Sequence, residues 1–260
     1  MIPPVFVSDT AALDASGGPG GKVTLSGPEG RHATTVRRLC PGERVDLTDG
    51  TGLRAACEVV AARPGAGELD LVVLTLRRDP EPACRVTVVQ AILKGDRGEL
   101  AVELMTEVGV DVIVPWAAER CVARWRPDRE DRALGRWRAS AREAAKQSRR
   151  SRFPDVTVQA RTPGVAERLA AADVAVLLDA EAVRPLAGLP LPSAGDVVLV
   201  VGPEGGVSPA ESAALAGAGA VPARLGPSVL RGSTAGAVAA AIVMSHCGRW
   251  ALACQGRDAR

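Results

Sequence analysis

The stretch from Val197 to Met244 consists of two successive units, each with a short strand, a glycine-rich loop and a helix. Its first strand, Val197 to Val201, is an unbroken apolar run, which is typical of a strand buried on both faces of a parallel sheet. In open α/β sheets, ligands bind in the crevice outside the carboxyl ends of the strands, where such loops lie. The stretch therefore predicts an α/β fold with a site at its two loops.

Residues that favour helix starts follow both loops. Ser208 precedes a proline and stands three positions before Glu211, which predicts a capping box at the first helix. Ser233 or Thr234 is the expected N-cap of the second, alanine-rich helix. Both helices should thus begin directly after their loops.

Each loop carries one charged side chain. Gly202 to Gly206 contains Glu204, and Gly226 to Gly232 contains Arg231. Glycine and proline often only turn the chain, and either loop alone would favour that interpretation. We expect the two loops to follow neighbouring parallel strands, and together they favour a binding site with one acidic and one basic group.

The front of the chain has the pattern of a β domain. From Lys22 to Leu76, apolar and polar residues alternate in several short runs, two of which flank a turn at Asp49 and Gly50. Several short strands in one small segment indicate a small barrel, a shape that often binds RNA. We therefore predict a β-barrel domain in residues 1–77.

The pattern changes after a short linker. Arg77 to Ala83 has two prolines and mixed charges, and from Arg85 onwards strands alternate with helices. Such alternation predicts a parallel sheet, so we assign residues 84–260 to an α/β domain. In its longest predicted helix, Trp137 falls on the apolar stripe and should be a core residue rather than a base-stacking one.

Composition excludes several classes of protein. No window resembles a transmembrane helix, and the first nine residues lack the features of a signal peptide, so we expect a cytoplasmic protein without membrane contact. Six cysteines are scattered without a C-x-x-C pair, and the two histidines lie far apart. We therefore expect neither a metal site nor disulfides, and interpret the cysteines, including Cys254, as buried or idle thiols.

Positive charge is concentrated in one segment. Residues 120 to 152 contain twelve Arg or Lys and four Asp or Glu. A concentration of this kind is typical of a phosphate-binding surface, although an isolated charge run is more often a solvated helix face. The end of the segment, with Gln147, Arg149, Arg150 and Arg152, is the strongest candidate for contact with RNA.

Eight short motifs occur in an order that resembles one known family. They are Gln90–Asp96, Glu103–Gly109, Ile113–Pro115, Glu119–Arg120, Glu143–Arg149, Leu177–Asp179, Gly202–Gly206 and Leu225–Arg231. Each motif is weak alone, but the ordered set covers most of the chain and is specific. The sequence is similar to the small-subunit (16S) ribosomal RNA uracil-N3 methyltransferase family, a branch of the SPOUT methyltransferases.

The resemblance implies a fold and a cofactor. The fold would be a PUA-like β-barrel in front of a SPOUT-type parallel sheet whose C-terminal part forms a deep trefoil knot, assembled as a homodimer. The methyl donor would be S-adenosylmethionine, with no metal. Matched position by position, the donor-binding residues would be Leu178, Gly202, Pro203, Glu204, Gly205, Leu225, Gly226, Leu230 and Thr234. Glycines permit the close approach of backbone groups, and leucines can enclose an adenine ring.

The substrate implied by the family is small-subunit ribosomal RNA, free or in the assembled small ribosomal subunit. We expect Arg231 to stabilise the uracil anion that develops during transfer, because a guanidinium stays charged; a structural ion pair with Glu204 is the alternative. Glu119, Arg120, Gln147 and Arg149 would hold the base or phosphates of the RNA, unless Glu119 and Arg149 simply pair.

The sequence departs from the family pattern at one motif. Many members have Leu-Arg-Thr-Glu-Thr-Ala at Leu230 to Ala235, where this chain has Gly232 and Ser233 in place of Thr and Glu. No carboxylate therefore stands there as a base, and the proton acceptor is not assigned.

Three other functions compete with this interpretation. They are a non-catalytic RNA-binding ribosome assembly protein, a SPOUT enzyme for transfer RNA or a ribose 2'-hydroxyl, and a dinucleotide-dependent oxidoreductase. The last lacks its G-x-G-x-x-G turn.

Overall fold

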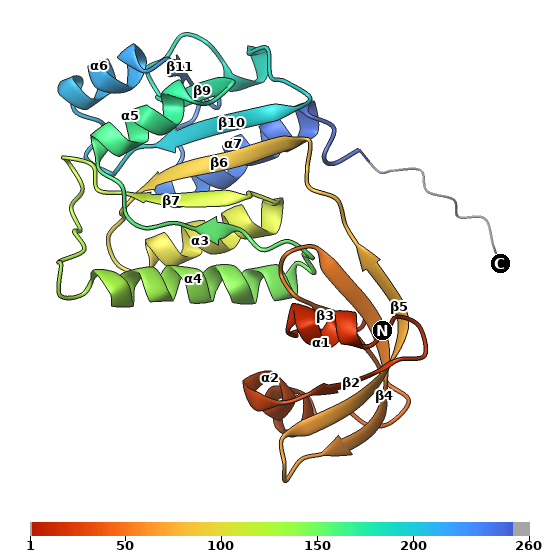
Figure 1. Cartoon of the computed structure of the whole chain (residues 1–260). Helices are drawn as coiled ribbons and strands as arrows, with labels where there is room; N and C mark the ends of the chain where they lie inside the picture. Colours follow the sequence, from red (N-terminus) through yellow and green to blue (C-terminus); the bar gives the residue numbers. More distant parts are fainter. Residues whose placement is uncertain (1, 252–260) are drawn as a thin grey trace. The chain divides into compact units, whose positions relative to one another are not determined.

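The predicted parallel sheet is present and has six strands. They are β6 (Cys84–Ala91), β7 (Val112–Trp116), β8 (Asp155–Val156), β9 (Val174–Leu178), β10 (Gly195–Val201) and β11 (Val221–Ala223), all parallel, in the order β11-β9-β10-β6-β7-β8 (Figure 1). The structure, a computed structural model, describes residues 2–251. It confirms the α/β class, whereas the trefoil knot stays a prediction.

Helices cover both faces of this sheet. On one face lie α3 (Arg97–Val108), α7 (Gly232–His246) and the apolar side of α4 (Glu130–Gln147); on the other lie α5 (Thr162–Ala170) and α6 (Pro209–Gly217) (Figure 1). Alternate side chains of β6 enter the two cores, Val88 on the α3 side and Val89 on the α5 side. Trp137 is 2% exposed, so its predicted core position is confirmed.

One of the two predicted helix starts is correct. Ser208 accepts a hydrogen bond from the backbone N–H of Glu211, and the Glu211 side chain accepts one from the backbone N–H of Ser208. The second prediction is wrong, because α7 begins at Gly232 with Arg231 as its N-cap residue. Thr234 instead donates its hydroxyl hydrogen to the Arg231 carbonyl at 3.1 Å, one turn back.

The two glycine-rich loops do not follow neighbouring strands, as the sequence suggested. β9 lies between β10 and β11 and pairs with both. Strand order in a parallel sheet is set by long-range packing, which the local pattern around β10 and β11 does not contain. The consequence is that the end of β9, at Leu178 and Asp179, lies between the two loops.

The first part of the chain forms a mixed sheet of five strands. These are β1 (Val5–Val7), β2 (Lys22–Leu25), β3 (Arg44–Thr48), β4 (Leu53–Arg63) and β5 (Glu68–Arg78), in the order β1-β3-β4-β5-β2. The predicted hairpin is β3-β4, and Asp49 stabilises its turn by accepting hydrogen bonds from the N–H groups of Thr51 and Leu53. Two short helices, α1 (Thr10–Ala15) and α2 (Gly27–Arg31), and a π-helical turn at His32–Val36 complete this part.

The boundary between the two parts differs from the prediction of 1–77 and 84–260. By internal contacts, the first unit comprises residues 1–81 together with residues 142–153, and the second comprises residues 82–141 and 154–260. Ion pairs and backbone hydrogen bonds join residues 142–153 to the first unit: Lys146 pairs with Glu29 at 3.2 Å, Arg149 pairs with Asp46 at 2.5 Å, and the N–H of Phe153 donates to the carbonyl of Gly50 at 2.8 Å. Such pairs span more than a hundred residues of sequence, where no local pattern reveals them.

Three of the described cysteines, Cys57, Cys84 and Cys121, are buried, and none of the five that lie in residues 2–251 forms a disulfide. Cys254 lies outside the described residues. In the same range, no group of three or more His, Cys, Asp or Glu side chains could hold a metal ion. No helix that the structure describes has the length and apolarity needed to cross a membrane.

Candidate cofactor pocket and active site

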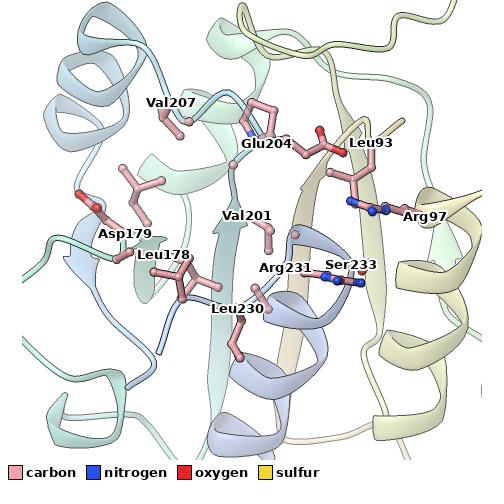
Figure 2. A pocket seen from close by; sticks show the side chains of 18 of the residues that line it. Leu93, Arg97, Leu178, Asp179, Val201, Glu204, Val207, Leu230, Arg231 and Ser233 are labelled. Carbon is pink, nitrogen blue, oxygen red and sulfur yellow. The ribbon is translucent and has the colours of Figure 1, made fainter. Parts of the chain in front are cut away.

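A pocket of about 480 Å³ opens at the carboxyl edge of the six-stranded sheet (Figure 2). Three strand ends contribute to it: Leu93 follows β6, Leu178 ends β9 and is followed by Asp179, and Gly202 follows β10. The start of α7 closes another side. This volume lies in the range of small-molecule sites, and the crevice has the position expected for an α/β sheet.

Most residues predicted to bind the donor come together here. Leu178, Gly202, Pro203, Glu204 and Leu230 line the pocket. An adjoining pocket of about 80 Å³ shares Leu178 and Leu230 with the first and is lined in addition by two other predicted residues, Leu225 and Gly226. Gly205 and Thr234 line neither pocket.

Two glycines bring backbone close to the pocket. A Cβ atom at Gly202 would lie 2.8 Å from a methyl carbon of Val207, and one at Gly232 would lie 3.0 Å from a methyl carbon of Leu93. Larger residues would therefore push these walls apart. Gly205 lies close to a different segment, because a Cβ atom at this position would lie 2.9 Å from the carbonyl oxygen of Arg120.

Charge is distributed unevenly around the pocket. In Figure 2, Arg231 and Arg97 lie on one side, whereas Asp179 lies on the other. Within the described residues Arg231 is exposed and forms no ion pair, and Glu204 accepts a hydrogen bond from the backbone N–H of Lys94 at 3.3 Å. The alternative of an Arg231–Glu204 pair is therefore absent, and the guanidinium is available to a ligand.

The first turn of α7 adds backbone donors to the same side. Gly232 and Ser233 line the pocket, and Arg231, the N-cap residue, offers no side-chain cap to the helix. The N-terminus of a helix carries a partial positive charge and uncapped N–H groups, which favour an anionic ligand group or developing negative charge. Ser233, predicted as a cap, is instead a buried lining residue.

Sequence reasoning missed several lining residues. Arg97 and Val201 gave no signal, because an arginine at a helix start and a valine in a buried strand have ordinary structural roles. Asp179 had a usable signal, since it is the polar residue that directly follows the apolar strand β9. Asp179 reaches the pocket because β9 lies between β10 and β11, a strand order that the local sequence pattern does not contain.

Comparisons with known proteins agree with this geometry. A model of the RNA methyltransferase domain matches residues 80–244, and a model of the RNA methyltransferase PUA domain matches residues 25–72. Ribosomal RNA small subunit methyltransferase E from Mycobacterium bovis and that from Mycobacterium tuberculosis are each 48% identical over 237 residues, which cover 89% of this chain and 89% of the relative. The chain belongs to the ribosomal RNA small subunit methyltransferase E family.

A solved member of the family carries the expected donor. The crystal structure of ribosomal RNA small subunit methyltransferase E from Neisseria gonorrhoeae, bound to S-adenosylmethionine, is 25% identical to this chain. It superimposes with a TM-score of 0.79 and covers 94% of this chain and 98% of the solved one. The α/β fold preceded by a PUA domain is thus that of the family.

In the present chain, the Glu119–Arg120 motif lies beside Gly205, in the loop that forms one wall of the pocket. Both side chains are exposed, and the backbone N–H of Glu119 donates to Glu211 at 2.8 Å. Cys121, two residues on, is buried, and burial raises the pKa of its thiol, with Glu204 and Glu211 adding to the effect. The thiol therefore stays protonated and is not an activated nucleophile.

The predicted basic tail lies in the first unit and has several structural contacts. Arg149 has a positive φ of 60° and binds both the Asp46 carboxylate and the carbonyl of Pro3. Arg152 donates to the carbonyl oxygens of Asp79 and Pro80. Gln147 is exposed, whereas Arg150 is partly buried. These contacts give Arg149 and Arg152 structural roles within the first unit. Their role in RNA binding stays a prediction.

Proposed function

We propose that the protein transfers a methyl group from S-adenosylmethionine to N3 of a uridine in small-subunit ribosomal RNA. The observation that carries the proposal is a pocket of about 480 Å³ formed by the predicted donor-binding loops, in a chain that is 48% identical to ribosomal RNA small subunit methyltransferase E over 89% of its length. The choice of N3 rests on the resemblance of the ordered motifs to the uracil-N3 branch of the SPOUT enzymes.

The lining residues fit this donor. Leu178, Val201 and Leu230 offer apolar surface to an adenine ring, and Asp179 offers carboxylate oxygens to ribose hydroxyls. The uncapped N–H groups at the start of α7 suit the carboxylate of a methionine moiety. The bound donor supplies an activated methyl group on a sulfonium, so the protein needs no metal or covalent intermediate for the transfer.

Arg231 has the position and the charge for the catalytic role. Methylation at N3 requires loss of the N3 proton, and the negative charge that develops spreads over the two carbonyl oxygens of the uracil. The guanidinium of Arg231 lines the pocket, is exposed, and has no carboxylate partner among residues 2–251. It can therefore direct its N–H groups at a carbonyl oxygen when the base enters, and electrostatic stabilisation of this kind is commonly the largest catalytic contribution.

The target uracil must leave any base stack to reach such a pocket. The substrate in this proposal is free small-subunit RNA or the assembled small ribosomal subunit, which places the reaction in the cytoplasm. In this proposal the residues that contact the RNA are Glu119, Arg120, Gln147, Arg149, Arg150 and Arg152.

We also propose that the protein acts as a homodimer. Val238 on α7 and Leu100 on α3 are 40% and 43% exposed, on two helices that pack against each other. Exposed apolar side chains on a pair of packed helices are suited to burial in a two-fold symmetric contact. Light scattering of the purified protein should give twice the chain mass of 26.8 kDa, and a mass of one chain at micromolar concentration would contradict the proposal.

A methyl-transfer assay tests the reaction and the substrate together. Purified protein is incubated with tritiated donor and, in parallel, small ribosomal subunits, free small-subunit RNA and transfer RNA, and the RNA is digested to nucleosides. We expect N3-methyluridine from the subunits or their RNA and no label on transfer RNA. Label on transfer RNA or on a ribose would contradict the proposed substrate, and donor binding without transfer to any RNA would favour the non-catalytic assembly protein.

A further inference from the structure

A second pocket lies at the same carboxyl edge of the parallel sheet. It has a volume of about 510 Å³ and is formed where β6, β7 and β8 end and α5 begins. It is next to the cofactor pocket, because consecutive residues, Ile92 and Leu93, line the second pocket and the cofactor pocket respectively. None of the residues assigned to the donor lines it.

Gln159 gives this pocket an unused acceptor. Its side-chain carbonyl oxygen is buried and has no hydrogen-bond partner among the described residues. An unpaired buried polar atom lowers stability, and such atoms are rare in native proteins. Gln159 lines the pocket, so a rotation of its side chain would bring this oxygen to a ligand. A ligand that presents an N–H donor there would remove the cost.

Trp125 gives the pocket a fixed aromatic wall. Its ring meets the ring of buried Trp137 edge to face, with centroids 5.1 Å apart and an interplanar angle of 87°. Trp137 is 2% exposed, so Trp125 is held by the core while it lines the pocket. Aromatic side chains in such positions stack with nucleobases in proteins that bind single-stranded nucleic acids.

The rim of the pocket is basic. Arg124 and Arg161 are both exposed, and neither forms an ion pair within residues 2–251. Arg161 is also the N-cap residue of α5, whose N-terminus has no side-chain cap and contributes Thr162 and Pro163 to the lining. Guanidinium groups and a helix N-terminus both favour phosphate.

Two carboxylates also belong to the pocket, and one of them is already engaged. Glu211 is 7% exposed, and its carboxylate accepts hydrogen bonds from the N–H of Glu119 at 2.8 Å and from the hydroxyl of Thr162 at 2.9 Å. Glu119 itself is exposed at the rim. The carboxylate of Glu211 thus orders the loop and α5. Arg124 donates one hydrogen bond to the carbonyl oxygen of Glu119 at 3.2 Å, and neither arginine is neutralised by a carboxylate within residues 2–251.

We propose that this second pocket binds a nucleotide of the substrate RNA close to the methylated uridine. Its base would lie against Trp125 and donate an N–H to the Gln159 oxygen, and its phosphate would meet Arg161 and Arg124. The inference rests on the proposed RNA methylation and adds to it a recognition site for a flanking nucleotide. Selection of one uridine among many requires contacts of this kind beyond the reactive base.

The test uses two variants of the pocket and one control on the same helix. Gln159→Leu removes the acceptor, Arg161→Ala removes a rim cation, and Arg168→Ala removes another exposed arginine, from the last turn of α5. Binding of labelled free small-subunit RNA is measured by fluorescence anisotropy over a series of salt concentrations. Donor affinity is measured by calorimetry on the same preparations.

We expect each pocket variant to bind the RNA about tenfold more weakly, the usual loss for one specific contact, and the control to bind within about twofold of the unchanged protein. Arg161→Ala should also lower the slope of log K against log salt by about 1, whereas Gln159→Leu should leave the slope unchanged. Donor affinity should stay the same in all three variants and shows that they are folded.

RNA affinities within about twofold of the unchanged protein for both pocket variants would overturn the inference. If Gln159→Leu loses donor binding and thus its fold, Arg161→Ala at the exposed rim decides alone. This outcome can be separated from the proposed function. If the unchanged protein binds the RNA but transfers no methyl group, the proposed reaction is wrong, whereas the effect of the pocket variants on RNA affinity can still be measured. Absence of any RNA binding by the unchanged protein would overturn both.

Discussion

Replacement of Arg231 by alanine should lower the turnover number about a hundredfold to a thousandfold, the loss typical for removal of one group that stabilises transition-state charge. The affinity for S-adenosylmethionine should change little, because the apolar and backbone walls of the pocket remain. The resistance to thermal unfolding should also be preserved, since Arg231 is exposed and forms no ion pair within the described residues. Steady-state methyl transfer, donor calorimetry and a melting curve on one preparation measure all three.

Arg231→Lys is the matched control for this prediction. Lysine keeps the positive charge but lacks the planar fork of N–H donors, so its turnover should lie between those of the alanine variant and the unchanged protein. Undiminished turnover of Arg231→Ala at saturating donor and RNA would remove the catalytic assignment. A turnover loss matched by an equal loss of donor affinity would make Arg231 a donor-binding residue instead.

The parts of the fold that the sequence predicted are those encoded locally. The capping box of Ser208 and Glu211 needs only four consecutive positions, and the strand predicted at Val197 to Val201 lies within β10 (Gly195–Val201). The start of α7 was misplaced although its signal was also local. Three polar or small residues in a row, Gly232 to Thr234, left the N-cap ambiguous, and the carbonyl of Arg231 is the one that accepts from the first turn.

The candidate site was predicted in its residues but not in its construction. Glu204 and Arg231 line one pocket, as predicted, although β9 lies between the strands that their loops follow. Glu211 was identified solely as a capping partner, whereas its carboxylate also holds the backbone of Glu119 and the hydroxyl of Thr162. Both errors concern contacts between segments far apart in the chain, which residue spacing does not encode.

The other large effect should follow from Asp46, which is 8% exposed at its side chain and accepts hydrogen bonds from Arg54 at 2.7 Å and Arg149 at 2.5 Å. Asp46→Ala leaves two partly buried guanidinium groups without their carboxylate, and removal of one partner from a buried ion pair commonly costs about 3–5 kcal/mol. We therefore expect the first unit to unfold at a clearly lower urea concentration. Donor binding should persist, since its pocket lies wholly in the second unit.

A double-mutant cycle then separates the two roles of Arg149. Its positive φ of 60° is held by the Asp46 carboxylate and the Pro3 carbonyl, so Arg149→Ala should destabilise the first unit when Asp46 is present and much less when Asp46 is alanine. If the losses of unfolding free energy in the two single variants simply add in the double variant, or if Asp46→Ala lowers the free energy of unfolding by less than about 1 kcal/mol, the pair is a weak surface ion pair. In that case the charge of Arg149 is free for RNA, and its alanine variant should weaken RNA binding without loss of stability.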